Sequence, residues 1–261
     1  MATDLQKLEQ ANNQNTCNIT LSLLYCMMKK ILISLVLSLA SISYAQNLTA
    51  KSWIVADENG RILTSENSTE QRSIASITKL MTAIVVLDAK QDLEEYIKPY
   101  TRRELIQLAI IKSDNAAAQK LCEHYPGGSR SCVAAMNRKA AELDMHNTKF
   151  IEPTGLSVMN VSTAEELVKL VQASSHYPEI VTDSKTKQGK IKTKKSLFSF
   201  NNTNPLVDQY NFIVSKTGYI RASGGCIVMM LDTELGRRIV ILLGSKNTRT
   251  RITEAASFFK V

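Results

Sequence analysis

The chain has 261 residues, of which 44% are hydrophobic and 21% are charged, with ten glycines and five prolines. This composition excludes a collagen-like, low-complexity or disordered chain, and the length allows one large domain with a sizeable core. Lysine and arginine outnumber aspartate and glutamate by 32 to 24, a formal charge of +8 that suits a solvated basic surface, nucleic acid, a membrane surface or an anionic cell-wall polymer.

The N-terminal region has the pattern of a secretory signal peptide. A basic segment at 28–30 precedes an apolar run at 31–40 and a small-residue segment that ends at Ala45. The apolar run is well short of the roughly 20 residues that span a bilayer, so a membrane anchor is the weaker alternative. We therefore expect an over-extended N-terminus at 1–27, a signal peptide at 28–45 and one exported domain at 46–261.

Hydrophobic periodicity predicts strands at both ends of this domain and helices in its middle. The expected strands are a hairpin of 53–56 and 61–64, and a late antiparallel meander of 212–216, 226–231 and 238–243. The expected helices are 76–89, 101–109, 115–123, 131–143, 163–174 and 251–260. The lysine-rich stretch 185–195 is expected to be an exposed loop or a hairpin edge. This order of elements predicts an α+β domain.

Cysteine usage leaves two readings open. Cleavage after Ala45 would leave Cys122, Cys132 and Cys226, an odd number that is neither a disulfide framework nor a zinc-binding pattern. Cys122 and Cys132 flank a Pro-Gly-Gly turn, and an oxidising compartment would allow them to join. Because both lie near predicted helices, their Cα atoms could instead be more than ~7 Å apart, which would leave free thiols.

Histidine chemistry is poorly supported by the sequence. His124, His146 and His176 form no H-E-x-x-H pair, and no G-x-S-x-G segment occurs. We therefore expect surface or structural histidines, no bound metal, and neither a zinc peptidase nor a Ser-His-Asp hydrolase.

A serine and a lysine offer a different nucleophile. Ser76-Ile77-Thr78-Lys79 places a hydroxyl and an amine three residues apart at the start of the most apolar predicted helix, where both share one face. Burial would lower the pKa of Lys79 and allow its amine to act as a base. The backbone N–H of Ser76, at the N-terminus of the helix, would face a developing oxyanion.

Each motif alone is weak evidence of function, and the order of the three motifs along the chain is more informative. S-x-x-K occurs at Ser76, Ser184 and Ser257, S-x-N occurs at Ser65, Ser113, Ser199 and Ser245, and K-T-G occurs once, at Lys216-Thr217-Gly218. The informative arrangement is S-x-x-K opening an apolar helix, S-D-N between helices and K-T-G on a late strand, behind a signal peptide. These are the three motifs of penicillin-recognising serine enzymes.

Further stretches carry a family resemblance. Residues 72–83, 124–128, 152–157 and 160–164 resemble the D-alanyl-D-alanine carboxypeptidase/endopeptidase family, the low-molecular-mass penicillin-binding proteins. The likeness runs from about Lys51 to the C-terminus and is greatest to the D-alanyl-D-alanine endopeptidase branch. It implies a β-lactamase/D,D-peptidase-like fold, in which an antiparallel sheet of five strands is flanked by helices and joined to an all-helical subdomain. The site would lie in the cleft between them.

The resemblance also implies a role for each motif residue. In catalysis, the expected residues are Ser76 as acyl-ester nucleophile, Lys79 as its proton acceptor and Ser113 as proton relay to the leaving amine. In substrate binding, they are Asn115, Lys216, Thr217, Gly218, Tyr219 and Arg251. Asn115 would orient Lys79, Lys216 would supply positive potential, Thr217 and Arg251 would bind a carboxylate, and the N–H groups of Ser76 and Tyr219 would form the oxyanion hole.

The implied activity is that of a serine-type D,D-peptidase, without metal or organic cofactor, that hydrolyses peptidoglycan stem peptides or cross-links. The expected inhibitors are β-lactams, with no nucleic-acid partner and no stable membrane anchor after signal cleavage. One alternative is a class A-like β-lactamase, although Glu166-Leu167 lies in a predicted helix and does not form the required E-x-x-L-N loop. Another is a non-catalytic peptidoglycan-binding relative.

Two departures from the family pattern add expectations. Ser76 and Ser113 are 37 positions apart, closer than is usual in the family, so the segment 92–103 looks shortened. Such a shortening is expected to open one wall of the cleft and to favour a second stem peptide, as in an endopeptidase. The chain also lacks an extra β-rich domain and an amphipathic tail, which favours a soluble periplasmic enzyme.

Overall fold

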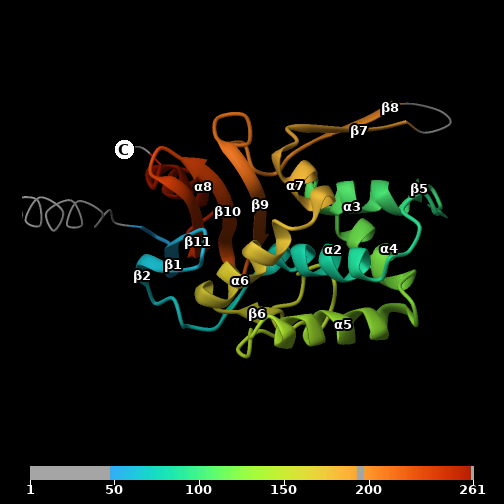
Figure 1. Cartoon of the computed structure of the whole chain (residues 1–261), viewed down its shortest axis with the longest axis horizontal. Coiled ribbons are helices and arrows are strands. Elements are labelled where there is room, and N and C mark those ends of the chain that lie inside the picture. Colours follow the sequence, from blue (N-terminus) through green and yellow to red (C-terminus); the bar gives the residue numbers. More distant parts are fainter. Residues whose placement is uncertain (1–47, 193–196, 260–261) are drawn as a thin grey trace, which may run out of the picture. The chain divides into compact units, whose positions relative to one another are not determined.

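The computed structural model describes residues 48–192 and 197–259 (Figure 1). The predicted over-extended N-terminus and signal peptide therefore lie outside the described residues, as does Lys260, the last residue of the predicted terminal helix. Within the described ranges, no helix is long and apolar enough to cross a membrane.

A five-stranded antiparallel sheet forms one side of the domain. Its strands, in the order β2-β1-β11-β10-β9, are Ile62–Glu66, Ser52–Asp57, Gly236–Ser245, Gly224–Thr233 and Asn211–Ile220. The predicted N-terminal hairpin and late meander are both confirmed. Each late strand extends beyond its apolar stretch because antiparallel hydrogen bonding continues through polar residues at the strand ends.

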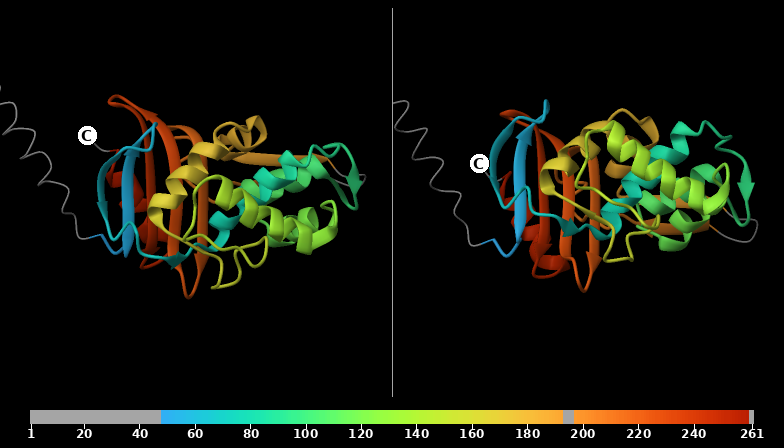
Figure 2. Two further views of the ribbon diagram at one scale, coloured as in Figure 1. Left: turned by 60° about the horizontal axis from the view of Figure 1, so that its bottom comes forward. Right: turned by 90° about the horizontal axis from the view of Figure 1, so that it is seen from below.

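The strands β9, β10 and β11 are largely buried on both faces, to which successive side chains point in turn, whereas the edge strand β2 is exposed. On one face, Phe212, Met229 and Leu242 pack against the terminal helix α8 (Thr248–Ser257). On the other face, Val228 and Ile241 belong to the main core, which the other helices share (Figure 2). This two-sided burial explains why the late strands read as continuous apolar runs.

The remaining helices confirm the predicted α+β class. They are the 3₁₀ helix η1 (Ala75–Ile77), α2 (Thr78–Asp88), α3 (Arg102–Ile110), α4 (Asn115–Glu123), α5 (Gly128–Glu142), α6 (Ala164–Ser174) and α7 (Pro178–Lys185). Residues 78–86 of α2 are all buried, in line with the apolar sequence of this helix. Helix α5 begins three residues before its predicted start, at Gly128. Helix α7 was not predicted, and its main sequence signal is a proline at the first helical position.

Three short strand pairs complete the fold. They are β3 (Arg72–Ser73) with β6 (Val161–Ser162), β4 (Tyr96–Ile97) with β5 (Tyr100–Thr101), and β7 (Gln188–Lys192) with β8 (Leu197–Asn201). Residues 188–192, within the described part of the lysine-rich stretch, are therefore one strand of a hairpin, one of the two predicted forms. Lys190 and Lys192 are exposed, whereas Gly189 and Ile191 between them are buried.

A disulfide bond joins the end of α4 to the beginning of α5. The Cα atoms of Cys122 and Cys132 are 5.3 Å apart, and Cys226 is a buried free thiol. The reading with free thiols at Cys122 and Cys132 is therefore wrong, because the tight turn between the helices brings these two positions together. Closing a loop of this length stabilises the folded chain by about 2–3 kcal/mol on the chain-entropy estimate.

Candidate active site

Ser76 lies in a 3₁₀ turn, whereas the sequence predicted the first turn of an α-helix. The preceding Ala75 has a positive φ of 47°, a conformation that a residue with a Cβ adopts only at an energetic cost. Lys79 follows three residues later, in the first turn of α2, so both side chains lie on one face of the helical segment. The Nζ of Lys79 donates a hydrogen bond to Ser76 Oγ at 2.8 Å.

Lys79 is fully buried and has three acceptors for its amine. Besides Ser76 Oγ, its Nζ contacts Asn115 Oδ1 at 2.7 Å and the Thr154 carbonyl oxygen at 2.5 Å. Burial lowers the pKa of Lys79 to about 7, although the carboxylates of Glu152 and Asp114 act in the opposite direction. At neutral pH a large fraction of Lys79 is therefore a neutral amine, which can accept the Ser76 proton.

The S-D-N segment joins α3 to α4 and directs the side chain of Asn115 at this pair. Its aspartate, Asp114, is the N-cap of α4, where its carboxylate accepts a hydrogen bond from the backbone N–H of Ala117 at 3.0 Å. The cap fixes the residues on either side of it: Asn115 reaches Lys79, and Ser113 has a positive φ of 59°. The central aspartate of the motif thus serves as a helix cap.

A second buried lysine lies beside Ser113. Lys216 comes from β9, and its Nζ donates hydrogen bonds to Ser113 Oγ at 2.8 Å and to the Thr217 carbonyl oxygen at 2.9 Å. Burial lowers the pKa of Lys216 well below its ordinary value, and the positive charges of Lys79 and Arg251 lower it further. The hydroxyls of Ser76 and Ser113 therefore each contact a different buried lysine.

The K-T-G strand approaches the nucleophile closely. A Cβ on Gly218 would lie 2.9 Å from the Ile74 carbonyl oxygen and from the Ser76 nitrogen, so only glycine fits there. Thr217 Oγ1 donates to Thr203 Oγ1 at 2.6 Å, and Tyr219 is 46% exposed.

Arg251 reaches this strand from α8. One of its terminal nitrogens donates to the Gly218 carbonyl oxygen at 2.6 Å, and its buried Nε has no hydrogen-bond partner among the described residues.

These residues surround a cleft of about 240 Å³. Its lining residues are Ser76, Ser113, Asn115, Leu156, Thr203, Thr217, Gly218, Tyr219 and Arg251. The structure thus brings all the predicted site residues together, with the two lysines buried behind the lining. Sequence reasoning assigned no role to Leu156 or Thr203, nor to the Thr154 carbonyl. Leu156 and Thr154 fall in a stretch that contributed only to the family resemblance.

Among the described residues, neither of the other two S-x-x-K serines has a hydrogen bond to a lysine. Lys187, three residues after Ser184, pairs with Asp208, and Ser184 Oγ is buried without a hydrogen-bond partner among the described residues. Ser257 Oγ donates to the Glu254 carbonyl oxygen at 2.6 Å, and its lysine lies outside the described ranges. Geometry therefore selects Ser76 from the three S-x-x-K serines.

The three histidines lie at the surface, as predicted, and none of them lines the cleft. His124, His146 and His176 are all exposed. In the part of the chain that the structure describes, no group of three His, Cys, Asp or Glu side chains is placed to hold a metal ion.

The structure places no residue of the segment 92–103 in the lining of the cleft. This segment contains the β4–β5 hairpin, at the end of the helical region away from the sheet (Figure 1). Its buried Arg102 pairs with Glu95 at 2.5 Å and donates to the Asp92 carbonyl oxygen at 3.2 Å. Spacing between motifs did not reveal where the intervening hairpin folds.

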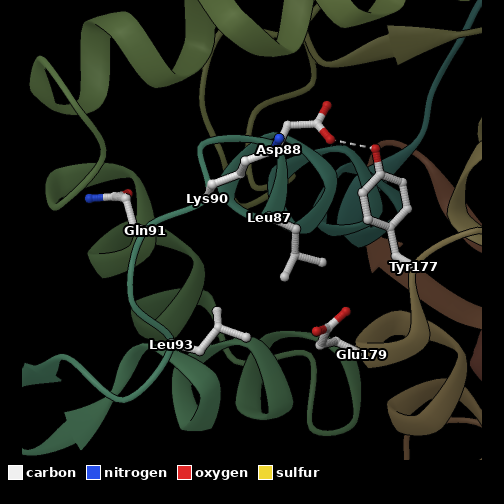
Figure 3. Close-up of a pocket in the computed structure, with 7 residues that line it drawn as sticks. All are labelled: Leu87, Asp88, Lys90, Gln91, Leu93, Tyr177 and Glu179. Atoms are coloured by element: carbon white, nitrogen blue, oxygen red, sulfur yellow. Dashed lines mark hydrogen bonds between the residues drawn. The ribbon is translucent and has the colours of Figure 1, made fainter.

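A second pocket, of about 360 Å³, lies at the C-terminal end of α2 (Figure 3). Asp88 is at its edge, where its carboxylate accepts hydrogen bonds from Tyr177 Oη at 2.7 Å and from Lys139 Nζ at 2.8 Å. The charge of Asp88 is therefore neutralised locally, and none of the motif residues lines this pocket.

Sequence comparison finds D-alanyl-D-alanine endopeptidases and carboxypeptidases among the relatives of this chain. The family described as D-alanyl-D-alanine carboxypeptidase matches residues 40–98 and 93–247. The chain is 40% identical to a D-alanyl-D-alanine endopeptidase of Escherichia coli, over 70% of this chain and 67% of the relative. It is 37% identical to a D-alanyl-D-alanine endopeptidase of Pseudomonas aeruginosa, over 83% of this chain and 78% of the relative.

Solved structures of similar proteins have the same fold as this chain. The D-alanyl-D-alanine carboxypeptidase of Mycobacterium tuberculosis superposes with a TM-score of 0.75 at 27% identity, covering 82% of this chain and 90% of that one. Penicillin-binding protein D2 of Listeria monocytogenes, solved with bound cefotaxime, gives a TM-score of 0.70 at 26% identity, covering 81% of this chain and 96% of that one. With its β-lactamase/D,D-peptidase-like fold and the three motifs in one cleft, the chain belongs to the D-alanyl-D-alanine carboxypeptidase family.

Proposed function

We propose that this chain is a serine-type D,D-peptidase that hydrolyses peptidoglycan peptides through an acyl-enzyme on Ser76. The observation that carries the proposal is the 2.8 Å contact between Lys79 Nζ and Ser76 Oγ beside an open cleft. A desolvated amine with a pKa of about 7 is well matched to general-base catalysis near neutral pH. Family membership supports the same class of reaction.

Acylation begins with proton transfer from Ser76 to neutral Lys79. Ser76 Oγ then attacks the carbonyl carbon of D-Ala, and the carbonyl oxygen becomes an oxyanion. The backbone N–H groups of Ser76 and Tyr219 would stabilise this charge, since they flank the point where β9 approaches the nucleophile turn. Asn115 holds the Lys79 amine in position through the hydrogen bond that it accepts.

The leaving amine needs a proton when the tetrahedral intermediate collapses. Ser113 is suited to relay it, because its hydroxyl lies in the cleft lining and contacts Lys216 Nζ at 2.8 Å. Ser113 would give its proton to the amine and regain the proton that Lys79 took from Ser76, which leaves Lys79 neutral again. Water then hydrolyses the ester and regenerates Ser76. Thr217 and Arg251, which also line the cleft, would bind the substrate carboxylate, and Gly218 lets β9 approach the turn that carries Ser76.

The same geometry explains why β-lactams are expected to inhibit the enzyme. A β-lactam amide would acylate Ser76 as the peptide does, while its leaving group stays tethered in the cleft. A β-lactamase would also need a carboxylate that activates water for fast deacylation. Glu166 is unsuited to this role, since it lies in α6 and its carboxylate accepts hydrogen bonds from Asn147 and Thr148.

Cross-link cleavage is expected to be at least comparable with removal of a terminal D-Ala. The support is that the relatives at 40% and 37% identity are both named endopeptidases. The test compares kcat/KM on a purified D-Ala–diaminopimelate cross-linked dimer with kcat/KM on a monomeric pentapeptide. A preference of more than about tenfold for the pentapeptide, or ~1.4 kcal/mol in transition-state binding, would identify a carboxypeptidase instead.

We further propose that the chain is exported to the periplasm after cleavage at Ala45, leaving one catalytic domain at 46–261. The Cys122–Cys132 disulfide supports an oxidising compartment. When the protein is expressed in a Gram-negative host, we expect it in the periplasmic fraction. Its mass should be that of a chain beginning at Gln46, and reduction should raise this mass by about two hydrogen atoms. A full-length mass in the cytoplasm, unchanged by reduction, would contradict both expectations.

A further inference from the structure

The loop of residues 152–160 is organised from within by one carboxylate. Glu152 Oε2 accepts hydrogen bonds from the backbone N–H and the hydroxyl of Thr154, both at 2.6 Å. Its Oε1 accepts from the backbone N–H of Gly155 at 2.7 Å, from that of Ser157 at 3.3 Å and from Asn160 Nδ2 at 2.9 Å. Hydrogen bonds to a charged acceptor are stronger than neutral ones, so Glu152 fixes the shape of the loop.

The part of the loop that Glu152 holds contacts both members of the proposed catalytic pair. The Thr154 carbonyl oxygen accepts a hydrogen bond from Lys79 Nζ at 2.5 Å. Gly155, with a positive φ of 82°, lies so close to the nucleophile turn that a Cβ there would be 2.0 Å from the Ala75 oxygen and 2.7 Å from the Ser76 nitrogen. The loop therefore supports the base through a carbonyl group and the nucleophile through backbone packing.

A second route links the same carboxylate to the strained turn. Asn160 Nδ2, which donates to Glu152, also contacts Thr78 Oγ1 at 3.1 Å. Thr78 Oγ1 in turn donates to the Ala75 carbonyl oxygen at 2.8 Å. Ala75 is the residue with positive φ that directs Ser76 toward Lys79, so this chain of contacts helps to hold it.

We propose that Glu152 is a positioning residue for the Ser76–Lys79 pair, acting through the Thr154 carbonyl and the Gly155 backbone. The proposal rests on the proposed roles of Ser76 and Lys79 in acylation. It gives the loop a function in catalysis beyond forming one side of the cleft.

The negative charge of Glu152 also affects the pKa of Lys79. Lys79 is influenced by the carboxylates of Glu152, in the loop, and Asp114, at the start of α4, and both favour its protonated form. Two basic side chains of the site carry the opposite charge. Lys216 of β9 interacts electrostatically with Lys79, and Arg251 of α8 interacts with Lys216. Removing the Glu152 charge should therefore lower the pKa of Lys79 below about 7, which makes its amine a weaker base.

The test measures the second-order rate of acylation by benzylpenicillin as a function of pH in Glu152→Gln. Because the neutral form of Lys79 is active, the wild-type rate should fall below about pH 7. In Glu152→Gln the rate at high pH is expected to fall about 10- to 100-fold, as for a misplaced catalytic pair. The acidic limb should also move to lower pH by on the order of half a pH unit.

Glu166→Gln provides a matched control. Like the partly buried Glu152, the buried Glu166 fixes a loop, through Asn147 at 2.7 Å and Thr148 at 2.6 Å, but it does not line the cleft. Its replacement should lower Tm while leaving the acidic limb unmoved and the acylation rate within about threefold of wild type. Glu152→Asp, which keeps the charge on a shorter side chain, should slow acylation and also leave the limb unmoved; it replaces Glu152→Gln if that variant does not fold.

The outcomes separate the two proposals. An acidic limb that stays at the wild-type pH in Glu152→Gln, or a wild-type rate in both Glu152 variants, overturns the positioning role while the proposed function stands. A wild-type protein that benzylpenicillin does not acylate overturns the proposed function, and the positioning role falls with it.

Discussion

Replacing Ser76 by alanine is expected to abolish hydrolysis of D-Ala peptides, with a loss in kcat of at least about 10⁴-fold. The variant lacks the oxygen that forms the acyl-enzyme, and the neighbouring Ser113 hydroxyl is hydrogen-bonded to Lys216 instead of Lys79. The measurement is the steady-state rate on a defined pentapeptide, with circular dichroism to confirm that the variant is folded.

Ser257→Ala is the matched control for this variant. Ser257 also begins an S-x-x-K tetrapeptide, but its hydroxyl donates to a carbonyl oxygen of its own helix and it does not line the cleft. We expect this variant to hydrolyse the pentapeptide at the wild-type rate. Retained activity in Ser76→Ala, or its loss in Ser257→Ala, would contradict the assignment of the nucleophile.

Lys79→Ala is expected to slow acylation about 10³-fold, because general-base catalysis by a positioned side chain typically contributes 10²–10⁴. The pH dependence gives a sharper criterion. With a Lys79 pKa of about 7 and a neutral amine as the active form, the wild-type acylation rate should fall as the pH drops through 7. The variant lacks the titrating group, so this acidic limb should disappear.

Lys187→Ala is the control for the base. Lys187 is the lysine of the second S-x-x-K tetrapeptide, and in the structure it pairs with Asp208. Its replacement should leave both the rate and the pH profile at wild-type values. An acidic limb that persists in Lys79→Ala would show that another group titrates, and Lys216 would then be the first candidate, since it is the other buried lysine of the site.

Local sequence patterns predicted most of the fold and the motif residues. The apolar runs at 212–216, 226–231 and 238–243 indicated three paired strands because strands buried on both faces carry continuous hydrophobic stretches. The same pattern put Lys216 on a strand. The spacing of Ser76 and Lys79 indicated contact because residues i and i+3 share a face in either type of helix.

The contributions that the sequence did not reveal depend on long-range contacts. Thr154 is 75 residues from Lys79 along the chain, and only the folded structure brings its carbonyl oxygen to the amine. Glu152 lies in a loop without periodicity, so no local pattern distinguishes it from a surface carboxylate. Thr203 reaches the cleft because the β7–β8 hairpin ends beside β9, as its contact with Thr217 shows.

The central claim is that Ser76 carries the acyl group, and peptide mapping of a benzylpenicillin adduct tests it most directly. After brief exposure to benzylpenicillin, denaturation and proteolysis, the account predicts one penicilloyl group, on the peptide that contains Ser76. An adduct on Ser113, Ser184 or Ser257 would contradict this assignment. Rapid turnover of penicillin would instead indicate a β-lactamase, and the absence of both adduct and turnover would indicate a non-catalytic protein.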